Sequence, residues 1–324
     1  MNHRAQIRML PDGRRVHMQD GPIDLIVEAF GESVEVECAY RAAAARFVTV
    51  LDELCEELTF LRAPTQLDGP MPNGIVARRM LEAVLPYATT TFITPMAAVA
   101  GAVAEEILGT MTSAADLRRA YVNDGGDIAL HLAAGEQFKV GMMEYRLPSA
   151  EPTFRKARNV RHPLFGSTKI DFEDPVRGIA TSGWRGRSFS LGIADAVNVL
   201  AETAAMADAA ATIIANAVDL PGHPAIGRVR ACDLAPDSDL GECFVTQSVG
   251  ELEADEIREA LDSGMRVAEY VQQRGLIWAA ALRLEDEIRV MSTSKSNAMT
   301  TEVTELHGGK QNLLGERRRR IVHA

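Results

Sequence analysis

The chain has 324 residues, 47% of them hydrophobic and 24% charged, and its formal net charge is −11. This composition is typical of a globular protein with a substantial core, and the negative charge argues against wholesale binding to nucleic acid or to an anionic membrane. No apolar run reaches the roughly 18 residues of a membrane span. The first residues lack the apolar run of a signal peptide, and the four cysteines form no CxxC pair. We therefore expect a cytoplasmic protein with reduced thiols.

The first third of the chain is predicted to form three strands and then three helices. The segments AQIRML and RRVHMQ flank the turn signal PDG, and IDLIVEAF follows the dipeptide GP. Apolar residues at helical spacing predict helices over 40–62, 75–86 and 94–111. Small residues along the third helix would let another backbone approach it closely.

In the rest of the chain, segments with the alternating pattern of strands are interspersed with segments whose apolar residues have helical spacing. AYVND and IALHL predict a hairpin, and residues 141–175, rich in Pro, Arg and Lys, predict a long loop. Strands are expected in GIATS, SFSLGI and AVNVL, followed by an alanine-rich helix over 203–218. A connection over 219–242 then leads to the strand CFVTQSV, a helix over 251–273 and a hairpin of LIWAAALRL and EIRVM that turns on Glu285 and Asp286.

Strands in pairs with helices between the pairs predict an α+β fold with mostly antiparallel sheets and helices packed on them. Residues 1–291 are expected to form a single domain that carries the long loop at about 141–175. The polar tail, 292–324, is expected to be disordered or only loosely docked, because it has few apolar residues. No GxGxxG or Walker A motif stands at a strand-to-helix junction, so neither a Rossmann nor a P-loop fold is supported.

The alanine-rich helix carries the most informative polar residues. Asp208, Thr212 and Asn216 are four residues apart, so they form a narrow polar stripe on a helix that is otherwise small or apolar. A buried carboxylate is costly unless it is paired or holds a metal. Asp208 with Thr212 could bind a hard cation through oxygen ligands. The alternative is a buried aspartate that caps a neighbouring loop.

Two glycine-containing turns are further candidates for a binding site. In the first, Asn123-Asp124-Gly125-Gly126-Asp127, two glycines follow a strand, where glycine lets the backbone approach a ligand; a plain hairpin turn is the alternative. In the second, the segment Thr181-Ser182-Gly183-Trp184-Arg185-Gly186-Arg187 offers backbone N–H groups, hydroxyls and arginines that could hold a phosphate. The alternative is a hairpin turn with exposed arginines, although an exposed indole is typical of a binding surface.

Other candidate motifs are weaker. Five basic residues of the long loop favour a solvated face over an anion-binding lid: Arg155, Lys156, Arg158, Arg161 and His162. The histidines show no HExxH spacing, and GxSxG is absent, so a metalloprotease or an α/β-hydrolase is not supported.

These motifs together resemble a known family. VNDGGDIAL, GIATSG and ADAAATIIANAV, in this order, are similar to the ApbE superfamily, which includes the FAD:protein FMN transferases. From about residue 21 to residue 290 the chain more closely resembles the branch known as UPF0280, in particular through GPIDLIV, FITPMAAVAGAVAEEIL and RGIATSGWRGRSFSLGIAD.

The resemblance implies a T-fold-like architecture and a Mg²⁺ ion that bridges the phosphates of FAD during transfer of FMN to a protein threonine. The acid and threonine that bind this ion in the transferases match Asp208 and Thr212, and a ligating backbone carbonyl matches Val99 approximately. The two turns would contribute the cofactor-binding residues Gly125, Gly126, Asp127, Thr181, Ser182 and Gly183. The implied partners are a flavin or other nucleotide and an acceptor protein, and a homo-oligomer is left open.

The chain departs from the transferases at several positions. Ala100 and Gly101 stand where those enzymes have a Lys-Gly pair, Glu105 replaces their following acid, and their flavin-contacting N-terminal segments are not recognisable. The alternative is therefore a non-catalytic ligand-binding or accessory protein of metabolism. Some UPF0280 members are associated with sulfide incorporation into homocysteine, which illustrates such a role.

Overall fold

The computed structural model describes residues 4–143, 164–292 and 299–300. Its α-helices are α1 (Ser33–Glu56), α2 (Leu58–Leu61), α3 (Ile75–Val84), α4 (Val99–Ala114), α5 (Ala204–Ala217), α6 (Ala231–Leu234) and α7 (Ala254–Gln273). Two 3₁₀ helices are η1 (Leu85–Tyr87) and η2 (Pro95–Ala98). The strands are β1 (Gln6–Met9), β2 (Val16–Asp20), β3 (Ile23–Phe30), β4 (Arg119–Asp124), β5 (Asp127–Leu132), β6 (Gln137–Met143), β7 (Leu164–Asp171), β8 (Gly178–Ser182), β9 (Ala196–Ala201), β10 (Ile226–Arg230), β11 (Phe244–Val249), β12 (Ala279–Leu284), β13 (Glu287–Ser292) and β14 (Met299–Thr300).

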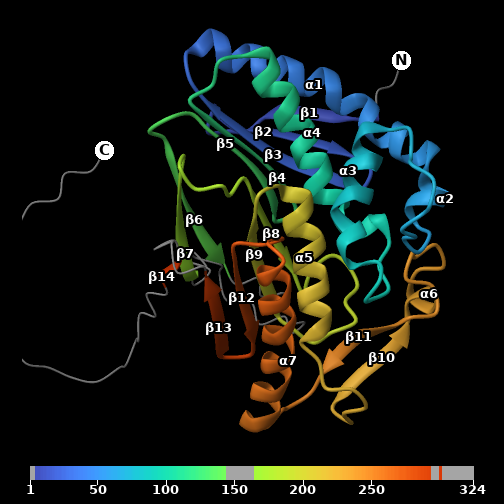
Figure 1. The fold of residues 1–324 in the computed structure, drawn as a ribbon. Coiled ribbons are helices and arrows are strands. Elements are labelled where there is room, and N and C mark those ends of the chain that lie inside the picture. The colour runs from blue at the N-terminus through green and yellow to red at the C-terminus, as the bar shows by residue number, and fades with distance from the viewer. Residues whose placement is uncertain (1–3, 144–163, 293–298, 301–324) are drawn as a thin grey trace, which may run out of the picture.

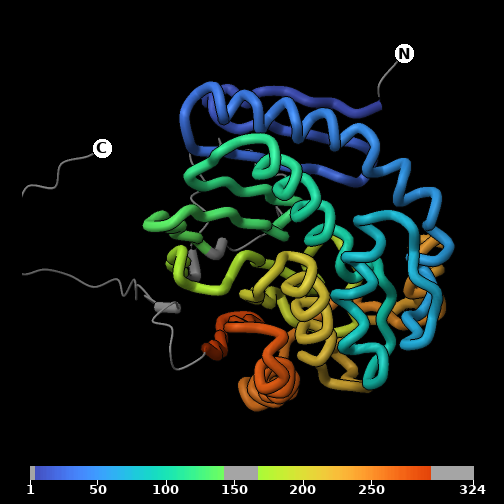
Figure 2. Tube along the Cα trace, turned by 45° about the horizontal axis from the view of Figure 1, so that its top comes forward, coloured from blue at the N-terminus to red at the C-terminus, as the bar shows by residue number. Residues whose placement is uncertain are grey.

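One nine-stranded sheet, in the order β1-β2-β3-β4-β5-β8-β9-β12-β13, organises the molecule (Figure 1). Smaller sheets are formed by β14-β7-β6 and by β10-β11, and every strand pair of the described residues is antiparallel. The N-terminal strands therefore lie at one end of the large sheet and the C-terminal strands at the other (Figure 2). The prediction of an α+β fold with mostly antiparallel sheets is confirmed.

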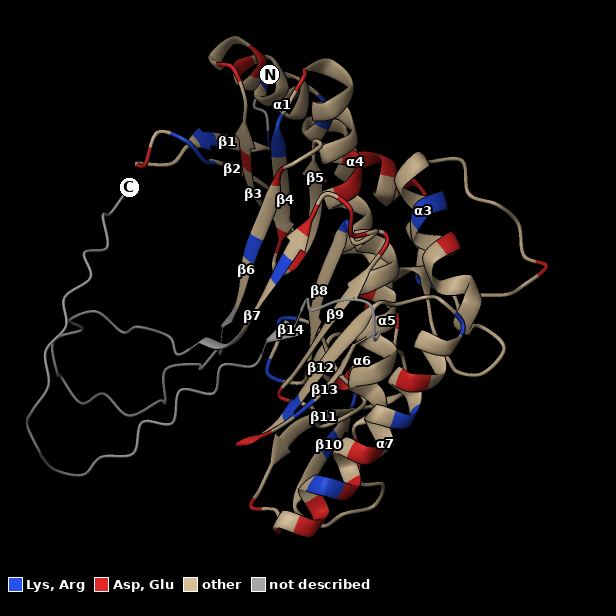
Figure 3. Cartoon of the chain, turned by 60° about the vertical axis from the view of Figure 1, so that its left-hand side comes forward, with Lys and Arg blue, Asp and Glu red and all other residues tan. Residues whose placement is uncertain are grey.

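Helices cover one face of the large sheet. Along the sheet, α1 lies over β2 and β3, α4 over β4 and β5, α5 over β8 and β9, and α7 over β12 and β13. The hairpin of β6 and β7 lies on the opposite side (Figure 3). Alternation along the strands explains the two layers, because residues of one parity face the helices and those of the other parity face the hairpin.

The main core lies between the sheet and the helices, and a smaller one lies on the other face. Ala180 and Val199, for example, belong to the large helix-side cluster. Their strand neighbours Ile179 and Leu200 pack instead with Ile170 of β7. Side chains on β8 and β9 can therefore be assigned to a face by their parity alone.

Three predicted segments differ from the structure. The loop at 141–175 is wrong at its ends, because 141–143 and 164–171 belong to β6 and β7; the basic residues Arg155, Lys156, Arg158, Arg161 and His162 lie outside the described residues. The predicted strand SFSLGI is wrong, because no strand forms over 188–193. Ser190 and Leu191 hydrogen-bond to Asn216 of α5, and the Ser190 carbonyl accepts from the N–H of Thr246 in β11 without forming a strand pair. The connection 219–242 contains β10 and α6, which sequence periodicity did not reveal.

Other predictions are confirmed or fall partly outside the described chain. The hairpin on Glu285 and Asp286 is present, and Glu285 adopts φ 52° there. The first helix begins at Ser33, earlier than predicted. Of the tail, only 292 and the short strand β14 are described. None of the helices in the described ranges combines the length and apolar character that crossing a membrane requires.

Candidate functional site

The polar stripe of helix α5 is less buried than the rest of the helix. Thr203 caps the helix, its hydroxyl oxygen accepting from the N–H of Met206 at 3.3 Å. Most residues of α5 are buried alanines or isoleucines, whereas Asp208, Thr212 and Asn216 are only half-buried. Asn216 accepts from Leu191 N–H at 2.9 Å, so it has a structural partner. Within the described part of the chain, the Thr212 hydroxyl makes no hydrogen bond.

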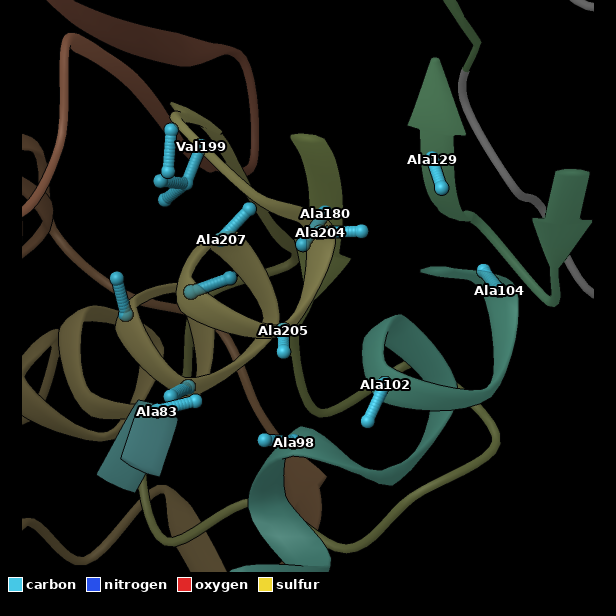
Figure 4. Close-up of a cluster of buried hydrophobic side chains, with 14 of the residues drawn as sticks. Ala83, Ala98, Ala102, Ala104, Ala129, Ala180, Val199, Ala204, Ala205 and Ala207 are labelled. Carbon is cyan, nitrogen blue, oxygen red and sulfur yellow. The ribbon is translucent and has the colours of Figure 1, made fainter. Parts of the chain in front are cut away.

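Close contact between α4 and α5 brings Asp208 to the start of α4. A Cβ atom at Gly101 would lie 2.3 Å from the carbonyl oxygen of Ala204, so only glycine permits this approach. Buried alanines from both helices, including Ala102 and Ala205, surround the contact (Figure 4). The small residues predicted to admit another backbone do so here.

The Asp208 carboxylate caps α4. Its Oδ2 accepts from the backbone N–H of Gly101 at 3.0 Å, in the first turn of α4, where the preceding Ala98 has no side chain that could cap. This position favours a negative charge, because the first N–H groups of a helix lack internal partners. The capping role that the sequence left open is therefore present, on a helix rather than on a loop. The Val99 carbonyl, the third predicted metal ligand, belongs to the same first turn.

The β4–β5 hairpin adds two more aspartates. Gly125 and Gly126 form its two-residue turn with φ values of 65° and 123°, which glycine adopts without strain. The turn makes Asp124 and Asp127 direct cross-strand partners. Asp127 Oδ1 accepts from the N–H of Thr181 at 3.1 Å, which ties the hairpin to the end of β8.

The three aspartates influence one another. The pKa of Asp208 is raised to about 7, mainly by burial and to a smaller extent by the nearby Asp124, against the opposing effect of the Gly101 N–H group. Burial likewise raises the pKa of Asp124 to about 7. Burial, and then the charge of Asp208, hold the pKa of Asp127 well above its ordinary value. The three carboxyl groups therefore form one electrostatic cluster, which we call the aspartate cluster.

The aspartate cluster has little positive charge near it. None of its three members forms an ion pair with a lysine or arginine of the described residues. Arg187 is the basic residue whose charge lowers the pKa of Asp124, and its guanidinium also donates to the carbonyl of Pro22 at 3.3 Å. It lies beside the turn, since a Cβ at Gly125 would be 3.3 Å from its Nη1. A cation or protons must therefore supply the missing compensation.

The second candidate turn is held by the protein itself. Asp195 accepts from the indole N–H of Trp184 at 3.2 Å, from the guanidinium of Arg185 and from the N–H of Glu285 at 2.7 Å. Trp184 is half-buried, so the interpretation of an exposed indole is wrong. The guanidinium carbon of Arg185 lies over the Trp184 ring, 4.7 Å from its centroid. Arg185 therefore already has an anionic partner within the protein.

The predicted cofactor-binding residues of this turn divide between the two faces of the sheet. The N–H of Thr181 joins the aspartate cluster, but its hydroxyl donates to Asn198 Oδ1 at 2.8 Å. These two residues are cross-strand partners with the parity of Ile179 and Leu200, so their side chains face the β6–β7 hairpin. Ser182 is half-buried, and Gly183 lies against the Asp195 carbonyl. The cofactor role of all six residues stays a prediction.

Two residues of the site were not among the predicted site residues. Asp124 belongs to the first candidate turn, but no role was assigned to it; it is 7% exposed, and its charge acts on Asp208. Glu105 was noted only as a replacement, yet its Oε1 accepts from the N–H of Ala205, in the first turn of α5, at 2.7 Å. The only sequence signal for either is a carboxylate within an apolar surrounding.

The donor set of the cluster fits a hard cation bound together with a substrate. In the ranges that the structure describes, no three His, Cys, Asp or Glu side chains converge to hold a metal by themselves. Mg²⁺ does not need such a cage, because it commonly takes one or two carboxylates and completes its shell with water and phosphate oxygens. Asp208, with Thr212 and a backbone carbonyl, is compatible with that kind of site.

Comparison with known proteins places the chain in a family. A UPF0280 protein of Methanopyrus kandleri is 34% identical over 172 residues, which are 52% of this chain and 61% of that protein. One of Methanosarcina acetivorans is 32% identical over 199 residues, 60% of this chain and 70% of that protein. A solved structure, the apo form of the Pseudomonas stutzeri flavinyl transferase ApbE, covers 90% of this chain and 94% of its own, with a TM-score of 0.42 and 12% identity.

The chain thus spans about three fifths of the Methanopyrus relative. The family model described as AbpE bacteria matches residues 7–290, nearly the whole of the described structure. The chain belongs to this AbpE family, as a UPF0280 member related to ApbE.

Proposed function

We propose that this protein is a Mg²⁺-dependent transferase that acts on FAD or on a related pyrophosphate. The observation that carries the proposal is the aspartate cluster, in which Asp208 faces Asp124 and Asp127 without an ion-pair partner in the described chain. Such a cluster is unfavourable in isolation and becomes favourable when a divalent cation enters. A magnesium ion would neutralise phosphate charge and assist displacement at phosphorus.

The residues of the chain have separate tasks in this proposal. Asp208 would hold the cation, with Thr212 and the Val99 carbonyl as further oxygen donors. The Gly101 N–H fixes the Asp208 carboxylate through its 3.0 Å hydrogen bond to Oδ2. The Gly125–Gly126 turn would let the protein backbone approach the ligand closely beside Asp127. The hydroxyl oxygen of a protein threonine would attack the FMN phosphorus of FAD, the pyrophosphate P–O bond would break, and AMP would leave while the hydroxyl proton passes to solvent.

Cleavage of the pyrophosphate tests this proposal directly. The protein is incubated with FAD and Mg²⁺, with and without EDTA. With water as the acceptor in place of a protein threonine, the reaction releases FMN and AMP, which are followed by chromatography. We expect release that requires Mg²⁺ and that falls by at least about a hundredfold in Asp208→Asn. A matched control is Glu28→Gln, a buried acid on the opposite face of the same sheet that binds Tyr121. Equal activity in Asp208→Asn and Glu28→Gln would contradict the proposal.

A ligand-binding accessory protein is the second candidate. Two observations favour it: Ala100 offers no cationic side chain where the transferases have lysine, and the Asp208 carboxylate already has a structural partner in Gly101. This candidate requires that FAD or FMN stabilise the protein without any FMN release or transfer. The same incubation therefore separates the two, since multiple turnovers would exclude the accessory role. A T-fold-like assembly and a cytoplasmic location remain predictions under both.

A further inference from the structure

Helices α4 and α5 cap each other. Asp208, one turn into α5, accepts from Gly101 in the first turn of α4 at 3.0 Å. Glu105, in the body of α4, accepts from Ala205 in the first turn of α5 at 2.7 Å. The two acids thus exchange hydrogen bonds around the point where the Gly101 and Ala204 backbones touch. The contact therefore couples the position of each helix start to the carboxylate of the other helix.

A network of ion pairs also holds the side chain of Glu105. Arg79 of α3 lies 3.1 Å from Glu105 Oε2 and 3.0 Å from Glu106 Oε2. Glu106 in turn receives Arg46 of α1 at 2.7 Å. Arg79, which also pairs with Glu106, thereby holds the Glu105 carboxylate, which is mostly shielded from solvent, in one orientation. Its second oxygen remains directed at the α5 N-terminus.

We infer that Glu105, oriented by Arg79, is a positioning residue that fixes the first turn of α5 and thereby sets the place of the Asp208 carboxylate. Asp208 lies four residues after Ala204, about one helical turn, so a shift of the first turn moves Asp208 with it. Glu105 touches neither Asp208 nor a ligand; it acts through the helix. The part of this inference that concerns ligand binding rests on the proposed function.

The neighbouring Glu106 provides a matched control. Both acids are on α4, both are partly shielded and both pair with Arg79, but Glu106 directs its other oxygen to Arg46 instead of to α5. If Glu105 served only to stabilise the fold, Glu105→Ala and Glu106→Gln would act alike on the site. Positioning predicts that only changes at Glu105 affect the aspartate cluster.

Hydrogen exchange of the intact protein without metal tests the positioning step on its own. In Glu105→Ala, the amide of Ala205 should exchange roughly tenfold faster, as expected for a lost cap. The Gly101 amide should also exchange faster, because its Asp208 partner has moved. Glu105→Gln, which keeps an accepting oxygen, should recover most of the protection. Should Glu105→Ala fail to fold, Glu105→Asp replaces it, because the shorter side chain withdraws the accepting oxygen from the Ala205 N–H. Unchanged Gly101 exchange in Glu105→Ala, or in Glu105→Asp where that variant is used, would overturn the inference, as would the same increase in Glu106→Gln.

A magnesium titration in the presence of FAD, followed by thermal melting, tests the consequence for binding. The Mg²⁺ concentration at half-effect should rise by about tenfold or more in Glu105→Ala and stay near the parent value in Glu106→Gln. A parent protein that shows no Mg²⁺ response refutes the proposed function, while the exchange result still decides the positioning. A normal titration in Glu105→Ala would overturn the inference even if its Ala205 amide exchanges faster.

Discussion

Two partly shielded aspartates near the same end of the sheet have opposite surroundings. Asp195 receives the Arg185 guanidinium, the Trp184 indole and the Glu285 N–H, so its charge is compensated by the protein. Asp208 receives backbone N–H groups of α4 and faces two further aspartates. Both carboxylates sit beside segments that the sequence marked as candidate sites. Only the second is left with uncompensated charge.

The difference shows how a buried acid indicates a ligand. A carboxylate that already pairs with an arginine and accepts several hydrogen bonds has a structural role, and a ligand would have to displace these partners to reach it. A carboxylate that faces other carboxylates gains most when a cation arrives from outside. Function is therefore better sought at the α4–α5 contact than at the second candidate turn, which we call the β8–β9 turn (residues 181–187), although that turn has the more conspicuous residues.

The largest effect is expected from disturbing the close approach of α4 and α5, which brings Asp208 to the start of α4. Gly101→Ala places a methyl group against the Ala204 carbonyl, so the two helices must separate. We expect a loss of more than about 3 kcal/mol in the free energy of unfolding, measured by urea denaturation. The control is Gly109→Ala on the same helix, where a Cβ meets nothing within 4 Å and should stabilise by up to about 1 kcal/mol. Similar results for the two variants would refute the packing argument.

The next effect tests the structural character of Asp195. Asp195→Asn removes the charge that Arg185 and the Glu285 N–H compensate, and it should destabilise the fold by about 1–3 kcal/mol. The loss should be the same with Mg²⁺ plus FAD as with EDTA, because this carboxylate is not open to a cation. Chemical denaturation under both conditions measures it. A loss that appears only when Mg²⁺ is present would place Asp195 in the ligand site instead.

The sequence predicted much of this site, but not its partners. The polar stripe of Asp208 and the turn at Gly125 and Gly126 follow from spacing and from glycine conformation, which are local properties. Asp124 and Glu105 were missed because their significance depends on burial beside groups about a hundred residues away or on another helix. The same holds for the short strand β10, which is paired with β11, and for the short helix α6, which follows β10 directly.

A smaller effect concerns pH. The Asp208 carboxyl keeps its proton up to about pH 7 in the folded protein but releases it near pH 4 when unfolded, so the folded state binds more protons between these values. Its contribution therefore makes the metal-free protein less stable as the pH rises from about 4 to 7. In Asp208→Asn this decrease in stability with pH should be absent. The free energy of unfolding of the variant should therefore rise relative to that of the parent across this pH range, and the difference should stay constant above it. Urea denaturation in EDTA across this pH range checks the prediction. A parent whose stability rises relative to that of the variant would contradict it.

The smallest effect concerns the indole at the β8–β9 turn. Trp184→Phe keeps an aromatic ring beside Arg185 but removes the donor to Asp195, which retains its two other partners. We expect a loss of about 1 kcal/mol or less in the free energy of unfolding. FAD and Mg²⁺ responses should be unchanged. Abolished flavin binding in a stably folded Trp184→Phe protein would show that the turn, and not the aspartate cluster alone, forms the site.

Thermal melting of the parent and of Asp208→Asn, each with Mg²⁺ plus FAD and each with EDTA, tests the central claim most directly. If Asp208 holds a cation, the parent melts at a higher temperature with Mg²⁺ and FAD, whereas the variant shows no such shift. In EDTA the variant is then as stable as the parent or more so, because an uncompensated buried charge has gone. If Asp208 only caps α4, the variant is destabilised by about 1 kcal/mol under both conditions and the parent shows no Mg²⁺-dependent shift. That second result would contradict the account.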